Sequence, residues 1–258
     1  MTYTDPFAAE ALASISAREQ RTVIGHASID LMSPMSEKTL SGLIAQIPAR
    51  ARMLDMGCGK AALARHLLKK DPAASAVCIE RNPVLAAQGE VLARRDGVSD
   101  RLQMIVADGR EWMASEKFDA IALLGATHAI GSLYEVLAYG RANLKPGGVV
   151  LLGEGIWASK PDPEYLAFLG ADESELMSQE ALVREVERAG FTVRYEHLSS
   201  AEEWDGYEGP YFQTLRDHAD ANGQHPFAEE ANAFEAMQAK HGRQCMGFLV
   251  MAAAVEPA

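Results

Sequence analysis

Three carboxylates each stand where an expected β-strand ends, and their spacing could hold one ligand. Asp55 ends a strand expected over 52–56 and leads into a Gly-Cys-Gly turn at 57–59, where glycine permits close approach of a ligand to the backbone. Glu80 ends the next strand, where a carboxylate can accept hydrogen bonds from both hydroxyls of a ribose. Asp108 ends the third strand and could accept from an adenine amino group. Each acid alone fits a helix cap or a solvated surface equally well, but the set predicts a nucleotide-type site.

The elements needed to position these carboxylates alternate along the chain from residue 52 onward. Strands are expected over 52–56, 76–80, 102–107, 118–124, 149–153, 191–197 and 245–255. Helices are expected over 60–70, 84–95, 133–144 and 179–189, with two more over 207–221 and 227–241. This alternation predicts βαβ units and a mainly parallel sheet with helices on both faces. Because the carboxyl ends of parallel strands share one edge, we expect Asp55, Glu80 and Asp108 to converge there.

The expected organisation is one core with two helical additions. Residues 1–35 are expected to form an N-terminal helical lid. Residues 36–198 and 243–258 are expected to form the core, and residues 199–242 a helical insertion between its last two strands. The absence of repeats and low-complexity linkers favours a single domain.

The order of these motifs resembles that of the class I S-adenosylmethionine-dependent methyltransferases. The matching segments are D-M-G-C-G-K-A at 55–61, the acid Glu80, V-A-D-G at 106–109, F-D-A-I at 118–121 and L-K-P-G-G at 144–148. One departure is Ala61, which stands in the position of the usual third glycine. The resemblance implies a doubly wound, seven-stranded, mainly parallel sheet of the Rossmann-like methyltransferase type. It also implies an antiparallel last strand and a helical lid.

Three further segments resemble a subgroup of small bacterial methyltransferases that mostly lack an assigned substrate. They are G-A-T-H-A-I-G at 125–131, G-E-G-I-W at 153–157 and W-D-G-Y-E at 204–208. This narrower resemblance indicates the class of reaction more than the acceptor.

The family resemblance implies that S-adenosyl-L-methionine lies across the carboxyl ends of the first four strands and leaves as S-adenosyl-L-homocysteine. Matched by position, the loop after Asp55 and the backbone of Gly125 would hold the methionine end, Glu80 the ribose and Asp108 the adenine. The full set of expected cofactor-binding residues is Asp55, Gly57, Cys58, Gly59, Glu80, Arg81, Asp108, Gly109 and Gly125. No resident metal is expected.

Methyl transfer from a sulfonium is an in-line displacement, so a base is needed only if the acceptor must lose a proton. His128 is the first candidate for that base, Glu154 the second and His26 the third. Structural alternatives stay open, with His128 as a helix cap and Glu154 as a group that orients a lid. Four aromatic residues could wall the acceptor site or simply pack between lid and core: Trp157, Trp204, Tyr207 and Tyr211.

Composition narrows the possible partners. With 24 Lys and Arg against 36 Asp and Glu, the formal net charge is −12, which disfavours nucleic acids and anionic membranes as partners. The cysteines at 58, 78 and 245 fit neither a disulfide framework nor a metal motif, so a cytoplasmic location is expected. No apolar run approaches the ~18 residues of a membrane span. A homodimer through the N-terminal helices remains possible.

The leading interpretation is an enzyme that methylates a small molecule. A nicotinamide-dependent oxidoreductase is an alternative, because residues 57–62 also fit G-x-G-x-x-A. A non-catalytic protein that binds S-adenosylmethionine is a second alternative. A methyltransferase acting on a macromolecule is a further one, for which no docking motif is evident.

Overall fold

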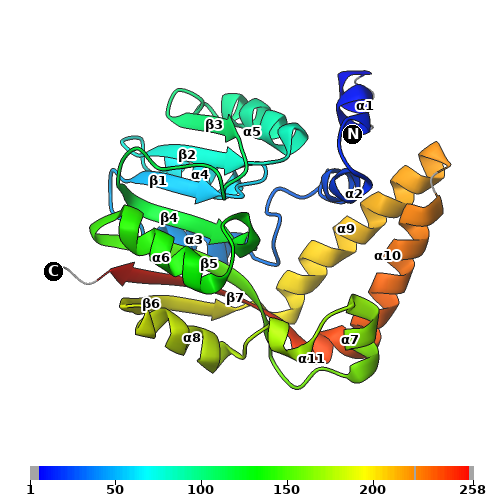
Figure 1. Ribbon diagram of the computed structural model, residues 1–258. Coiled ribbons are helices and arrows are strands. Elements are labelled where there is room, and N and C mark those ends of the chain that lie inside the picture. Colours follow the sequence, from blue (N-terminus) through cyan, green and yellow to red (C-terminus); the bar gives the residue numbers. More distant parts are fainter. Residues whose placement is uncertain (1–5, 224, 256–258) are drawn as a thin grey trace.

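A seven-stranded sheet forms the centre of the computed structural model, which describes residues 6–223 and 225–255 (Figure 1). Its order is β3-β2-β1-β4-β5-β7-β6. The strands are β1 (Arg52–Met56), β2 (Ser75–Glu80), β3 (Leu102–Val106), β4 (Phe118–Leu124), β5 (Leu144–Trp157), β6 (Phe191–Leu198) and β7 (Met246–Val255). β7 runs antiparallel to β5 and β6, whereas β1 to β5 pair in parallel. The expected fold class, with its antiparallel last strand, is confirmed.

Helices cover both faces of the sheet. On one face the apolar sides of α3 (Glu37–Ile44), α4 (Ala62–Lys70) and α5 (Pro83–Arg95) contribute to a core cluster with alternate strand residues. On the other face α6 (Leu133–Asn143) and α8 (Gln179–Arg188), which lie in front of the sheet in Figure 1, pack into a second cluster. This double covering is why the central strands read as continuous apolar runs, while the edge strand β6 alternates buried and exposed residues.

The remaining helices lie beyond the carboxyl ends of the parallel strands. They are α1 (Pro6–Ala13), α2 (Ala17–Gly25), α7 (Pro163–Leu169), α9 (Ala201–Asn222), α10 (His225–Met237) and the short α11 (Arg243–Cys245). Three single turns complete the list: η1 (Thr127–Ala129), η2 (Glu173–Glu175) and the π-helical η3 (Gln238–Gly242). No described helix is long and apolar enough to cross a membrane.

Helix α9 forms an antiparallel pair with α10, and α2 packs against it (Figure 1). Arg21 of α2 makes an ion pair with Glu230 of α10 at 2.8 Å. Helix α9 begins six residues earlier than the expected 207, because Ser200 accepts a hydrogen bond from the Glu203 amide and forms a capping box with it. These contacts carry the N-terminal helices and the insertion to the edge of the sheet where the three carboxylates stand.

Candidate functional site

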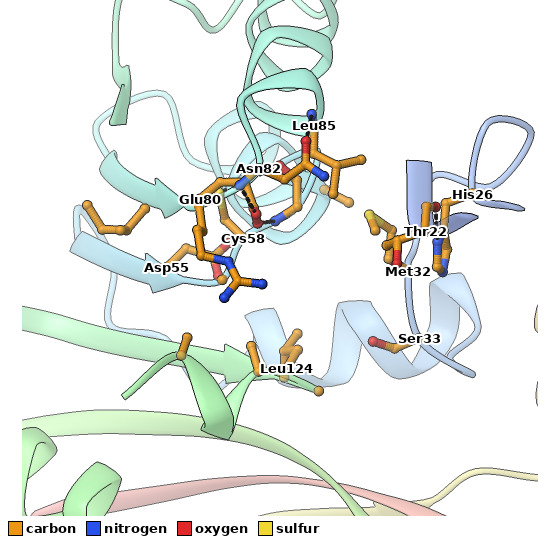
Figure 2. Close-up of a pocket in the computed structure, with 18 of the residues that line it drawn as sticks. Thr22, His26, Met32, Ser33, Asp55, Cys58, Glu80, Asn82, Leu85 and Leu124 are labelled. Carbon is orange, nitrogen blue, oxygen red and sulfur yellow. Dashed lines mark hydrogen bonds between the residues drawn. The ribbon is translucent and has the colours of Figure 1, made fainter. Parts of the chain in front are cut away.

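A cavity of about 690 Å³ opens at the carboxyl ends of the parallel strands, beneath α2. Asp55, Glu80 and Asp108 all line it, so the structure brings the three carboxylates to one site. Figure 2 shows Asp55 and Glu80 on one side of this first cavity, with Thr22 and His26 on the other. Of the other expected cofactor-binding residues, Gly57, Cys58, Gly59, Arg81, Gly109 and Gly125 line it too.

The glycine turn brings backbone, not side chains, to the floor of this cavity. Gly57 has φ +66°, and a Cβ there would lie 2.6 Å from the Cβ of Ala126 in the loop after β4. Ala61, the departure from the family motif, adopts the same left-handed region with φ 57° and ψ 36°. It is fully buried and directly precedes α4, which has no side-chain cap. The loop therefore keeps the path that a third glycine would allow, at the cost of some backbone strain.

Glu80 joins the glycine turn to the start of the next helix. Its carboxylate accepts the backbone N–H of Gly59 and that of Asn82, each at 2.8 Å. The side chain of Asn82 in turn caps α5 by accepting the N–H of Val84 at 2.9 Å. Burial raises the pKa of Glu80, although the two N–H donors oppose that shift. Each carboxylate oxygen retains acceptor capacity toward hydroxyl groups in the cavity.

Asp55 is a buried acid near the end of β1. Its side chain is 4% exposed, and no residue in the described ranges donates a hydrogen bond to its carboxylate. Burial raises the pKa of Asp55 to about 7, and the nearby Glu80 charge adds to the effect. An unpaired buried carboxylate is costly, so this site favours a ligand that brings hydrogen-bond donors or positive charge.

Asp108 differs because it already has a cationic partner. Arg110 donates to both carboxylate oxygens, at 3.1 Å through Nε and 2.7 Å through Nη2. These hydrogen bonds lower the pKa of Asp108 to about 2. Beside it, a Cβ on Gly109 would lie 2.6 Å from the carbonyl oxygen of Ala129, so only glycine fits without a shift of the backbone.

His128 lies on η1, where it lines the first cavity and stays exposed. Its pKa is lowered by burial first, and then by the charges of Arg81, Arg18 and Arg110. The ring is therefore neutral near pH 7 and has a nitrogen free to take a proton.

His26, Tyr207 and Tyr211 also line this cavity, from the end of α2 and from α9. The His26 and Tyr211 rings meet edge to face with centroids 4.8 Å apart, and Tyr207 stacks on Tyr211 at 6.3 Å. Of the four aromatic residues expected around the acceptor, these two are therefore at the cavity.

The two tryptophans lie elsewhere. Trp157 is buried against Tyr165 and Cys245 and donates its indole N–H to the Glu173 carbonyl at 2.8 Å. Trp204 packs on the main core cluster, with the Arg243 guanidinium 5.8 Å from its ring centroid. Their positions correspond to the packing alternative, not to a wall of the cavity.

Glu154 does not line the cavity either, and strand geometry gives the reason. Leu152 and Ile156, two residues before and after it on β5, belong to the core cluster beneath α6 and α8. Side chains at this spacing share one face of a strand, so Glu154 is directed toward that cluster. Its Oε1 is buried without a hydrogen-bond partner among the described residues, and burial raises the pKa of Glu154 to about 7.

This buried acid makes stability depend on pH. A folded-state pKa above the ordinary value destabilises the fold as pH rises from about 4.5 through 7, where the unfolded chain releases the proton first. We expect the stabilising effect of Glu154→Gln to grow by about 2 to 3 kcal/mol between pH 4.5 and pH 8. Urea denaturation of both proteins across this range measures it, with exposed Glu196→Gln as the control. A difference that stays constant with pH would contradict the expectation.

Lys60 lines neither cavity but supports the first one, a role that sequence reasoning missed. Its side chain is buried, and Nζ donates to the carbonyls of His26, at 2.8 Å, and Ile29. The residue after the glycine turn thus anchors the segment that follows α2. A lysine inside an otherwise apolar helix start was the available signal, but its partners lie more than 30 residues away in sequence.

A second cavity of about 520 Å³ adjoins the first and was also not expected. Leu31, Ser33, Met35 and Tyr207 line both cavities. The rest of its wall comes from the start of α3, from β6 and from the start of α9, including Thr39, Tyr195, His197, Ser200 and Glu203.

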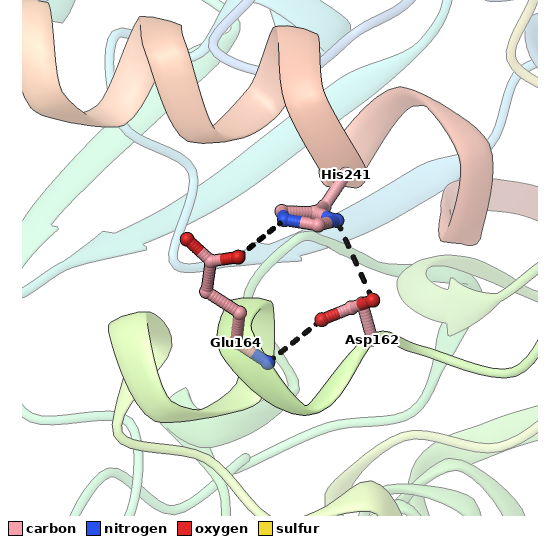
Figure 3. Close-up of side chains that lie close together, drawn as sticks. All are labelled: Asp162, Glu164 and His241. Carbon is pink, nitrogen blue, oxygen red and sulfur yellow. Dashed lines mark hydrogen bonds and ion pairs between the residues drawn. The ribbon is translucent and has the colours of Figure 1, made fainter.

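One cluster outside both cavities has the residue types of a metal site (Figure 3). Asp162, Glu164 and His241 offer ligand atoms within 4.8 Å of one another. Lys240, however, already donates to both oxygens of Glu164, at 2.6 and 2.7 Å, and Asp162 caps α7 by accepting the Glu164 amide at 2.8 Å. We interpret the cluster as an ion-pair network that fastens α7 to η3.

Residues 32–196, well over half of the chain, match a family model described as Methyltransferase domain. A curated relative named Uncharacterized protein YjhP, from Escherichia coli strain K12, is 28% identical over 228 residues, covering 85% of this chain and 92% of that protein. The solved structure of YjhP from E. coli aligns with a TM-score of 0.83 at 26% identity, over 92% of this chain and all of that one.

Two solved S-adenosylmethionine-dependent methyltransferases, each in complex with S-adenosyl-L-homocysteine, share the fold. The protein from Geobacter sulfurreducens aligns with a TM-score of 0.83 over 93% of this chain and 98% of that one. The protein from Thiobacillus denitrificans aligns with a TM-score of 0.84 over 94% of this chain and 99% of that one. Each is 24% identical to this chain, a level at which the likeness concerns the fold.

Proposed function

Because the chain belongs to the methyltransferase-domain family and has the fold of S-adenosylmethionine-dependent methyltransferases, we propose that it transfers the methyl group of S-adenosylmethionine to a small-molecule acceptor. The observation that carries the proposal is the single cavity lined by Asp55, Glu80 and Asp108 together with the glycine turn. When bound, the cofactor supplies a methyl group already activated by a sulfonium sulfur.

The residues of the first cavity fit this cofactor. The unpartnered carboxylate of Asp55 would receive hydrogen-bond donors from the methionine end, beside the backbone of Gly57, Gly59 and Gly125. Glu80, held in place by two N–H groups, would accept from the ribose hydroxyls. Asp108 and Gly109 would meet the adenine, where the Arg110 pair keeps Asp108 ionised and therefore able only to accept.

Size and access support a small acceptor over a macromolecule. The second cavity holds about 520 Å³, lies beneath α9 and shares a wall with the first. A chamber of this size suits a compact molecule, and in-line displacement requires the acceptor to be aligned next to the methyl group. His128 and His26, which both line the first cavity, remain the candidate bases.

A calorimetric titration with S-adenosylhomocysteine tests the cofactor site. We expect binding, and we expect no fluorescence change on mixing with reduced nicotinamide dinucleotide, the ligand of the alternative oxidoreductase. Incubation with methyl-labelled S-adenosylmethionine and low-mass metabolites from a cell extract then tests transfer, with the labelled product identified by mass. Binding without any labelled product would favour the non-catalytic alternative. Failure to bind S-adenosylhomocysteine would refute the proposal.

A further inference from the structure

Two hydrogen bonds in series link Thr22, His26 and Tyr207 and end at the wall between the two cavities. The direction of donation is the same in both. Nδ1 of His26 lies 2.7 Å from the Thr22 carbonyl oxygen, and Nε2 lies 3.0 Å from the Tyr207 hydroxyl. A carbonyl can only accept, so Nδ1 carries the proton of the neutral ring and Nε2 is bare. The Tyr207 hydroxyl must therefore donate to Nε2, which leaves only lone pairs for a ligand.

Burial keeps this arrangement neutral. It lowers the pKa of His26 to about 4, and the charge of Lys60 adds to the effect. Burial also raises the pKa of Tyr207 well above its ordinary value. The other charged groups that act on the pair are Glu208 on Tyr207, and Arg21 and Glu230 on the adjoining Tyr211. Near pH 7 the Tyr207 oxygen thus faces the cavities as a hydrogen-bond acceptor.

The pair is also held rigidly where the two chambers meet. Lys60 fixes the backbone of His26 through its carbonyl, and Tyr211 packs against both rings. Tyr207 itself lines both cavities. The expected cofactor-binding residues line the first cavity, and none of them lines the second. The wall of the second cavity carries hydroxyl groups, from Ser33, Ser36, Thr39, Tyr195, Ser200 and Tyr207, together with the side chains of Lys38, His197, Glu202 and Glu203.

Given the proposed function, we propose that Tyr207 is a catalytic residue that takes the proton of a hydroxyl-bearing acceptor bound in the second cavity. His26 positions the Tyr207 hydroxyl and receives the Tyr207 proton. In this step the acceptor oxygen forms its bond to the methyl carbon, and the electron pair of the breaking carbon–sulfur bond goes to sulfur. The acceptor O–H proton moves to the Tyr207 oxygen as the Tyr207 proton moves to Nε2 of His26. Imidazolium then hydrogen-bonds to the Thr22 carbonyl until it loses a proton to water.

The weak basicity of His26 favours a hydroxyl over an amine. An amine is protonated near pH 7, and its ammonium would not give a proton to a ring whose pKa is about 4. A hydroxyl oxygen becomes strongly acidic only as its bond to the methyl carbon forms, so even a weak base in contact can take the proton at that stage.

The first test needs no acceptor. Nitrogen NMR of the histidine rings, with and without S-adenosylhomocysteine, reports the tautomer of His26. We expect a neutral ring protonated at Nδ1, and a shift of the Nε2 resonance in Tyr207→Phe. A ring protonated at Nε2 in the wild-type protein would overturn the proposal.

The second test compares variants that separate hydrogen bonding from proton transfer. With methyl-labelled S-adenosylmethionine and the metabolite extract, we expect Tyr207→Phe to lower kcat about 100-fold, as for the loss of a general base. His26→Gln keeps an acceptor for the Tyr207 hydroxyl but takes up no proton, and is expected to lower kcat comparably. The matched control is Tyr134→Phe, an exposed tyrosine on α6 that lines neither cavity, with kcat near wild type. All three variants should bind S-adenosylhomocysteine within about threefold of wild type, which shows that the fold and cofactor site persist.

The outcomes distinguish this inference from the proposed function. With a ¹³C-labelled methyl group, the carbon shift of the product identifies the methylated atom, and we expect an O-methyl product. Product methylated at nitrogen, sulfur or carbon, or full activity in Tyr207→Phe, would overturn the inference while methyl transfer itself stands. If the wild-type protein labels nothing, the proposed function fails, and this inference fails with it.

Discussion

Replacement of Glu80 by alanine is expected to weaken binding of S-adenosylhomocysteine by at least about 100-fold, or roughly 3 kcal/mol. The carboxylate would accept from the ribose, and each charge-assisted hydrogen bond contributes about 1.5 to 3 kcal/mol. The same carboxylate holds the amides of Gly59 and Asn82, each at 2.8 Å. Its loss therefore also releases the glycine turn from the start of α5.

This second effect gives the variant a distinct signature. Two buried N–H groups lose their acceptor, so the free energy of unfolding should fall by about 2 kcal/mol even without ligand. The stability and affinity of Glu80→Gln should lie between those of the wild type and Glu80→Ala. The amide oxygen can still accept one N–H, whereas the amide NH₂ faces the other N–H donor. Calorimetric titration and urea denaturation measure the two effects. Exposed Glu90→Ala on α5 is the control, and equal affinities in Glu80→Ala and the control would contradict the assigned role.

The sequence was sufficient to predict the sheet and its carboxylate edge, because both depend on local patterns. The bounds of β1 and β4 agree with those expected, and the three carboxylates lie at or just beyond the ends of β1, β2 and β3, which parallel pairing brings to one edge. Gly57 and Gly109 were also predicted as part of the site, and in the structure a Cβ on either would lie 2.6 Å from a neighbouring atom. What positions the cofactor site is therefore largely encoded within short segments.

The other wall of the site could not be predicted in this way. Glu154 stands next to Gly153 at the carboxyl end of β5, yet the two-residue period of the strand directs it toward the cluster under α6 and α8. The face of the sheet on which the Glu154 side chain lies could be determined only once β5 was placed between two helical layers. Likewise, the meeting of His26 with Tyr207 joins positions 181 residues apart, through the packing of α2 on α9. Tertiary contacts of this separation leave no local pattern.

The second large effect concerns Arg65, a cation buried between the lid segment and the core. Its side chain is 1% exposed and makes ion pairs with Asp96, at 2.5 Å, and with Asp30. Burial works to raise the pKa of Asp96, but the hydrogen bond and charge of Arg65 outweigh it and hold the pKa below its ordinary value. Removing one partner of a buried pair leaves an uncompensated charge, which typically costs about 3 to 5 kcal/mol.

We therefore expect Asp96→Ala to lower the free energy of unfolding by about 3 kcal/mol near pH 7, because Arg65 stays buried with one partner lost. Arg65→Met should cost less, since it removes the buried charge and leaves Asp96 near Lys69, at 3.7 Å. Because the folded-state pKa of Asp96 is lowered, its contribution is present above the ordinary pKa of about 4 and is lost as pH falls further. Urea denaturation of the three proteins at pH 7 and at pH 3 tests this order. If Arg65→Met proved the more destabilising at pH 7, the pair would be acting through packing of the long side chain and not through its charge.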